Sequence, residues 1–95
     1  LGARAGMLFV FATPVDAAFW MKNTRIPLSV AFLDAGGKIL AIRRMAPCPR
    51  EPCPVYGSPA PYRLALEVNA GAFTRWHAVR GDRVTFPPGI LALAG

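Results

Sequence analysis

Two cysteines, Cys48 and Cys53, form the pair of residues whose spacing most directly suggests chemistry. Four residues separate them in the segment Cys-Pro-Arg-Glu-Pro-Cys. A proline turn can bring their Cα atoms within the roughly 7 Å that a disulfide requires, and an oxidising compartment would favour that bond, whereas a reducing cytosol would favour free thiols. Redox catalysts usually separate their cysteines by two residues rather than four. A disulfide is therefore the preferred interpretation.

A metal or cofactor site is not expected. A closed metal site needs about four ligands, and the chain offers no second close pair of ligand residues beside the cysteines. His77, the only histidine, follows a short predicted helix whose C-terminal dipole suits a cation. The two serines, Ser29 and Ser58, lie outside any nucleophile elbow, which argues against a hydrolase triad.

Glu67 is the one carboxylate that no turn or exposed loop explains. The others lie in such positions: Asp16, Asp34, Glu51 and Asp82. Glu67 lies on a predicted strand, where it could pair with Lys22 or Arg63, or accept backbone N–H bonds. A structural anchor and a ligand-contacting carboxylate both remain open.

The stretch 19–28 combines aromatic and polar side chains. Strand alternation places Trp20 and Lys22 on one face, where they could form a stacking and polar platform. The alternative, and the preferred one, is a core tryptophan with Lys22 extending past it. Asn23 fits a loop held by side-chain-to-backbone bonds. The candidate binding residues are Trp20, Lys22, Asn23, Tyr56 and Glu67.

The elements that must position these residues are mostly strands. Short apolar or alternating runs predict strands over 6–11, 18–23, 28–34, 38–45, 62–68 and 83–86. Residues 28–45 read as a hairpin turning at 34–37, residues 13–17 as a turn, and 62–68 as a strand buried on one face. Asn69 is expected to cap a two-turn helix over 70–76. Prolines throughout 46–61 predict an irregular loop without ladder pairing, and loops of this length are often functional.

These elements predict a mainly β fold, either a small two-layer sandwich or a partly closed barrel, with one short helix at one end. The 95 residues suit a single domain, with a core over about 6–86 and an apolar tail over 87–95. Hydrophobic residues make up 54%, which excludes intrinsic disorder. No apolar run approaches the roughly 20 residues of a membrane span. The net charge of +6 comes from scattered basic residues without a nucleic-acid motif, so nucleic acid is not an expected partner.

Several segments carry a combined pattern across residues 6–86: 6–11, 19–24, 26–28, 32–39, 47–48, 52–56, 66–71 and 81–84. Together they resemble an uncharacterised family, domain of unknown function 192. The resemblance implies a compact sandwich-like β domain of small bacterial and archaeal proteins, often with an export leader, and no known activity. The family's recurring residues, whose roles are unassigned, match Trp20, Met21, Lys22, Asn23, Thr24, Pro27, Asp34, Cys48, Cys53, Tyr56 and Glu67. Members usually carry an earlier strand before the position of Gly6, and its absence here would uncover a sheet edge.

We therefore expect an exported, periplasmic or secreted module that binds a small ligand or a protein without catalysis; a cytoplasmic location is the alternative. Its cleft would lie where loop 46–61 meets Trp20, Lys22, Asn23 and Glu67. One alternative is an enzyme using Cys48 and Cys53 with Glu67 or Lys22. Another is an interaction protein that pairs weakly with itself through an exposed strand edge.

Overall fold

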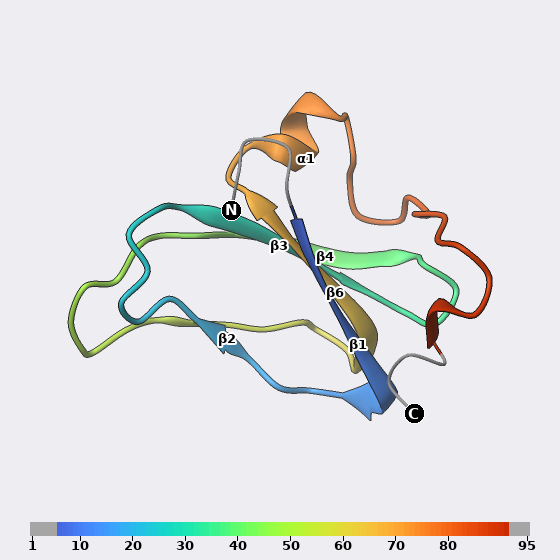
Figure 1. Cartoon of the computed structure of the whole chain (residues 1–95), viewed down its shortest axis with the longest axis horizontal. Coiled ribbons are helices and arrows are strands. Elements are labelled where there is room, and N and C mark those ends of the chain that lie inside the picture. Colours follow the sequence, from blue (N-terminus) through green and yellow to red (C-terminus); the bar gives the residue numbers. More distant parts are fainter. Residues whose placement is uncertain (1–5, 92–95) are drawn as a thin grey trace.

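The computed structural model describes residues 6–91 and shows a mainly β fold of two antiparallel sheets and one short helix (Figure 1). Its elements are β1 (Gly6–Val15), β2 (Phe19–Trp20), β3 (Leu28–Leu33), β4 (Ile39–Met45), β5 (Val55–Tyr56), β6 (Tyr62–Asn69) and α1 (Ala72–Arg75). The predicted fold class is confirmed in its sandwich form, because neither sheet of the described chain closes into a barrel. No helix in this part of the chain has the length and apolarity to cross a membrane.

The larger sheet has the strand order β1-β6-β3-β4, and β2 pairs with β5 in the smaller sheet. The hairpin predicted over 28–45 is confirmed: Leu28 lies opposite Met45, and the register holds as far as Phe32 and Ala41, after which it shifts. Strand β6 lies between β1 and β3. As a central strand, β6 needs a partner on each edge. It has both only when β1, the first strand of the chain, pairs with it on the side away from β3.

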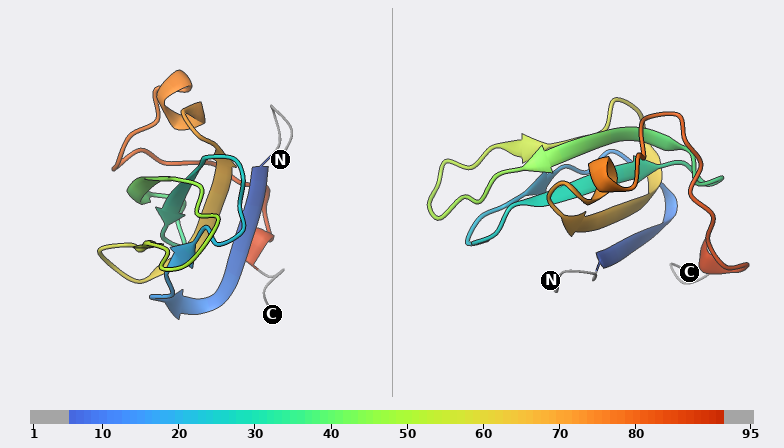
Figure 2. Two further views of the ribbon diagram at one scale, coloured as in Figure 1. Left: turned by 90° about the vertical axis from the view of Figure 1, so that its left-hand side faces the viewer. Right: turned by 90° about the horizontal axis from the view of Figure 1, so that it is seen from above.

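Two apolar clusters cover the two faces of the larger sheet. The first lies under the smaller sheet, where the Phe19 ring makes edge-to-face contacts with Phe9 at 5.2 Å and with Phe32 at 5.8 Å. The second lies under α1 and the segment after it, and includes Leu64 and Phe73. Figure 1 and Figure 2 show the smaller sheet and α1 on opposite sides of the larger sheet.

The expectation that 62–68 is buried on one face only is wrong. Ala65 is fully buried beneath the smaller sheet, while Leu64 is buried in the second cluster. Tyr62 joins the first cluster, and its hydroxyl donates to the Ala17 carbonyl at 2.6 Å. Burial raises the pKa of this tyrosine, and the nearby charge of Asp16 acts in the same direction.

Several predicted boundaries also need correction. Strand β1 runs through the turn predicted at 13–17 as far as Val15, because Pro14 lies on an edge strand that tolerates a missing donor. Strand β2 ends at Trp20 rather than 23, because the chain turns at Asn23, whose φ is 63°. Loop 46–61 contains β5, since only two of its residues need to pair, and neither of them is proline.

The C-terminal third departs from the sequence pattern most. The helix is a single turn, and Gly71, in a left-handed conformation, precedes it in place of the predicted cap Asn69. The strand predicted at 83–86 is only one bridge, between Arg83 and Lys38, because the segment crosses the hairpin turn instead of running beside a strand. Leu91 packs against the second cluster, and the remainder of the predicted tail, 92–95, lies outside the described residues.

The hairpin turn is held by Asp34 and by a close crossing at Gly37. One Asp34 carboxylate oxygen accepts bonds from the amides of Gly36 and Lys38, as expected of a turn aspartate. Gly37 has a φ of 84°, and the Val84 amide donates to its carbonyl at 2.8 Å. A Cβ at Gly37 would collide with the Val84 carbonyl oxygen. The turn therefore requires glycine here for both its backbone angle and its lack of a side chain.

Replacing Gly37 with alanine is expected to lower the free energy of unfolding by about 2 kcal/mol or more, because strain at positive φ adds to a backbone collision. Gly81→Ala is the matched control: its φ is 94°, but a Cβ there meets nothing within 4 Å. Urea denaturation should place the Gly81 variant within about 1–2 kcal/mol of the parent. Equal losses in the two variants would show that the crossing at Val84 is unimportant.

Candidate functional site

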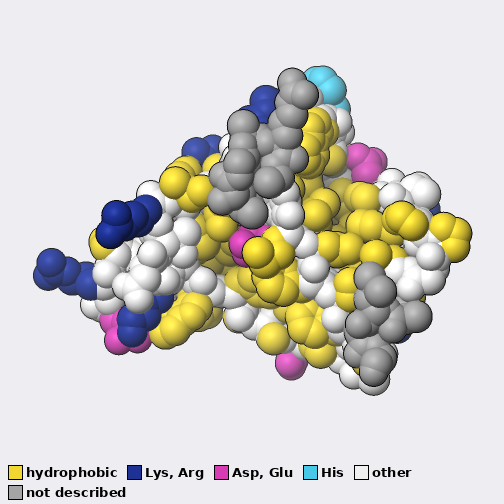
Figure 3. Space-filling view, in the orientation of Figure 1, with side chains coloured by type: hydrophobic (Ala, Val, Ile, Leu, Met, Phe, Trp, Pro, Cys, Tyr) yellow, Lys and Arg dark blue, Asp and Glu magenta, His cyan; other side chains and the backbone are white. Residues whose placement is uncertain are grey.

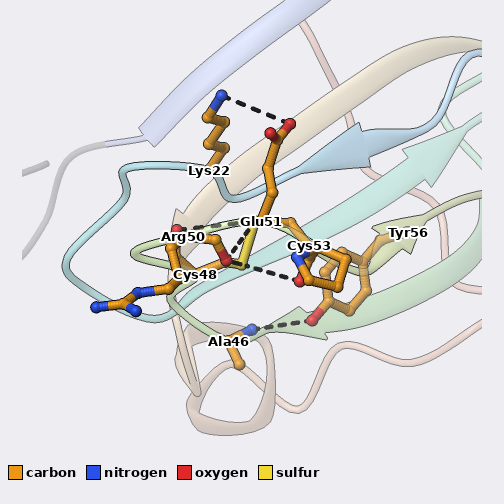
Figure 4. Close-up of a disulfide and its surroundings, with 8 residues drawn as sticks. Lys22, Ala46, Cys48, Arg50, Glu51, Cys53 and Tyr56 are labelled. Atoms are coloured by element: carbon orange, nitrogen blue, oxygen red, sulfur yellow. Dashed lines mark hydrogen bonds and ion pairs between the residues drawn. A yellow bond between two sulfur atoms is a disulfide. The ribbon is translucent and has the colours of Figure 1, made fainter.

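The two cysteines form a disulfide that closes the proline loop, which confirms the sequence prediction (Figure 4). Their Cα atoms lie 5.8 Å apart. Cys48 also forms a parallel bridge with Lys22, and its carbonyl accepts the Asn23 amide at 2.9 Å. The covalent ring is thus fastened to the chain that follows β2. We call residues 22–25 and 46–54 together the tip.

Lys22 and Trp20 lie on the exposed side of the tip. The Lys22 amine is 3.5 Å from a Glu51 carboxylate oxygen and 5.6 Å from the centre of the Trp20 ring. Trp20 is 53% exposed and pairs across the small sheet with Val55, which is 67% exposed. The interpretation of Trp20 as a core residue is therefore wrong, and the platform alternative fits the geometry. The carboxylate that sequence reasoning set aside, Glu51, is the one that pairs with Lys22.

Asn23 turns the chain away from β2 and borders an open hollow of about 510 Å³. Its left-handed backbone suits asparagine, which tolerates positive φ better than most residues. The expected side-chain-to-backbone bond is not what holds it, because its backbone amide makes the bond to Cys48. The hollow is lined by Asn23, Thr24, Arg25, Pro47 and Pro49. Of these, only Asn23 was among the candidate binding residues, although the proline density of 46–61 was a signal for Pro47 and Pro49.

Tyr56 supports the tip from beneath. Its hydroxyl accepts a bond from the Ala46 amide at 3.2 Å, and its ring packs against the first apolar cluster. The same residue pairs with Phe19 in the small sheet. Tyr56 is therefore placed to hold the start of the proline loop, and Figure 4 shows it on the other side of the disulfide from Lys22.

Glu67 lies on the larger sheet, between Met7 of β1 and Val30 of β3. The predicted pairings are wrong: Lys22 pairs with Glu51, and the Arg63 Nε donates to the Phe11 carbonyl at 2.6 Å. Within residues 6–91, the Glu67 carboxylate makes no ion pair or hydrogen bond. Burial raises its pKa. Ring contact, bridge and backbone bond link Trp20, Lys22 and Asn23 to one another and to the disulfide loop. Among residues 6–91, no hydrogen bond or ion pair joins Glu67 to them.

The tip is basic. Figure 3 shows Lys and Arg side chains gathered at the end of the molecule where the loops after β2 and β4 meet, with one acidic group among them. Lys22, Arg25 and Arg50 supply the positive charge and Glu51 the negative charge. Only Lys22 forms an ion pair in the described part of the tip. No group of three or more His, Cys, Asp and Glu residues suited to a metal ion occurs among residues 6–91.

Comparison with known proteins identifies an uncharacterised family and two similar solved structures. Residues 1–86 match the family model DUF192, described as "Uncharacterized ACR". A protein of unknown function from Novosphingobium aromaticivorans has a TM-score of 0.79 and 31% identity, covering 90% of this chain and 60% of that one. A "putative transcription regulator" from Sinorhizobium meliloti has a TM-score of 0.75 and 34% identity, covering 87% and 63%. The chain thus spans less than two thirds of either structure. No curated protein matches it.

Replacing Cys48 and Cys53 together with serine is expected to lower the free energy of unfolding by about 2 kcal/mol, since the small ring no longer restricts the unfolded chain. Urea denaturation without reductant measures the change. The parent protein in reductant should match the variant. A variant as stable as the oxidised parent would contradict a stabilising role for the ring.

A second expectation concerns Glu67 and pH. Because its folded pKa lies above the ordinary 4.5, the folded state holds this proton more tightly than the unfolded state does. The stabilisation is complete below pH 4.5 and is lost as the pH rises past it. Between about pH 4 and pH 7, the parent should therefore lose stability relative to Glu67→Gln in urea denaturation. Glu51→Gln, in the exposed ion pair, is the control, and parallel curves for the parent and the Glu67 variant would refute the linkage.

Proposed function

The chain belongs to the uncharacterised family DUF192, and within it we propose that this protein is an exported, non-catalytic module that binds a small anionic ligand at the tip. The observation that carries the proposal is the hollow beside Asn23. It is bordered by Arg25 and by two loop prolines, and a disulfide ring fixed to the neighbouring chain holds its wall. A site that is rigid before binding loses little conformational entropy when its ligand arrives.

The charges around the hollow support an anionic ligand. Arg25 forms no ion pair in the described chain, so its guanidinium remains available to a carboxylate or phosphate. Lys22 is held near the same loop, but an exposed pair such as Lys22–Glu51 is worth about 0–1 kcal/mol and is readily exchanged for another acceptor. Both cations can therefore be recruited by a ligand at low cost.

The exposed apolar pair of Trp20 and Val55 supports a recognition role for this end of the molecule. Trp20 and Val55 present adjoining apolar side chains on the outer face of the small sheet, although neither is required by the core. Tryptophan on a surface is typical of binding sites, since its large rigid ring gives contact area with few torsions to fix. Trp20 is three residues before Asn23 in the chain, so we expect a ligand with a flat or apolar portion to use this pair as well.

Export is supported by the disulfide, because such bonds persist in oxidising compartments and are rare in reducing ones. The Sinorhizobium protein's description does not extend to this chain, whose described helix has four residues and is too short to read a DNA groove. The short helix and the geometry of the tip thus support ligand binding over nucleic-acid recognition.

Titration with sodium phosphate at constant ionic strength, followed by ¹H–¹⁵N NMR, tests the proposal. The amides of residues 23–25 should shift saturably, because phosphate accepts bonds from Arg25. Arg25→Gln should weaken binding by about ten-fold or more, as expected for a lost charged hydrogen bond. Arg75→Gln, at the end of α1, is the matched control and should leave the affinity unchanged. Shifts that are absent, or equal in both variants, would overturn the anionic site.

A further inference from the structure

A second groove runs along the outer edge of β4. It consists of two adjoining hollows of about 420 and 470 Å³, which share Leu40, Pro59 and Arg80 as lining residues. One wall is the end of the proline loop, and the other is the segment 78–81. We call it the β4 groove. It lies on the opposite side of the strand from β3 and shares no lining residue with the hollow of the tip.

The edge of β4 is open for most of the length of this groove. At its start, Ile39 donates its amide to the Asp82 carbonyl and accepts the Gly81 amide. A short piece of extended chain therefore already pairs with the outer edge at that point. From Leu40 to Met45, no backbone group of the described chain bonds to any segment other than β3. The pairing at Ile39 shows that this edge accepts a further strand, and the rest of the edge offers the same ladder groups.

The side chains of the groove have one sign of charge. Lys38, Arg43 and Arg80 line it, and no Asp or Glu does. The Arg43 Nε donates to the Gly57 carbonyl at 3.2 Å, which holds the guanidinium at the groove and leaves its other N–H groups for an acceptor. Exposed Val79 adds an apolar surface between the cations. The β4 groove thus combines an open backbone edge with cationic and apolar side chains.

From this arrangement we infer that the β4 groove binds an extended acidic segment of a partner protein, which adds to the larger sheet as a strand beside β4. The open edge from Leu40 to Met45 would accommodate about six residues of extended chain, or roughly 20 Å. Ladder hydrogen bonds supply a sequence-independent attraction, and carboxylates on alternate residues of the segment meet Lys38, Arg43 and Arg80. This surface is independent of the ligand proposed at the tip.

The test uses a fluorescein-labelled hexapeptide of alternating Glu and Val, blocked at its C-terminus, with fluorescence anisotropy as the readout. The acidic peptide should bind in the micromolar range and lose affinity as salt rises. A double variant, Arg43→Gln with Arg80→Gln, should weaken it at least ten-fold. Arg50→Gln with Arg75→Gln removes the same charge elsewhere and should have less than a two-fold effect. Hydrogen exchange of the amides in 40–45 should slow when the acidic peptide binds.

Any of the following results would overturn the inference. The first is equal binding of a hexapeptide of alternating Gln and Val, since the charges would then have no role. The second is binding of the acidic peptide without protection of 40–45, or no binding at 1 mM peptide. The third is a single-stranded hexadeoxythymidylate that competes for the groove and binds more tightly than the acidic peptide, which would make it a nucleic-acid surface. Circular dichroism establishes that both double variants fold.

Discussion

The packing of Phe19 against the larger sheet is the contact on which the rest of the molecule depends. Its ring meets Phe9 on β1 and Phe32 on β3, across the fully buried Ala65 of the strand between them. The small side chain of Ala65 leaves space between the two aromatic rings, and the Phe19 ring fills that space. Because β2 is only two residues long, backbone pairing alone would not hold the smaller sheet in place. The aromatic contact fixes it there, and the tip extends from the strands that it fixes.

The position of the tip follows from this contact. One residue beyond the Phe19–Trp20 strand, Met21 is buried in the same cluster, and Lys22 then bridges to Cys48. Burial and exposure therefore alternate along the chain, with Phe19 and Met21 inward and Trp20 and Lys22 outward. The polar and aromatic side chains at the surface are presented by a backbone whose opposite side is held in the core. The tip is therefore held in place both by the packing of Phe19 and Met21 in the core and by the disulfide.

The sequence was informative wherever local pattern decides structure. The hairpin turn at Asp34, the disulfide and the alternation through Trp20 and Lys22 depend on neighbours within a few residues, and all were predicted. Prediction from the sequence failed where contacts between residues far apart in the chain determine which side chains are buried or paired. The side of β6 that contains Ala65 is buried only because the smaller sheet lies on it, and Glu51 meets Lys22 only because the loop is fastened to residue 48. Trp20 was assigned to the core for the same reason: its exposure depends on which face of a short strand the larger sheet occupies.

The central place of β6 has a consequence for the order in which the fold can form. Gly6 pairs with Val68, and Leu28 pairs with Asn69, so the first strand has no neighbour in its sheet until β6 has been synthesised, more than 50 residues later. The β3–β4 hairpin closes a short loop and can form early, whereas β1 must wait for a closure with a large entropic cost. Until then its apolar run from Met7 to Phe11 is exposed in the growing chain. A protein built this way completes its larger sheet only after β6 has been made, so the step that buries the first strand comes late in folding.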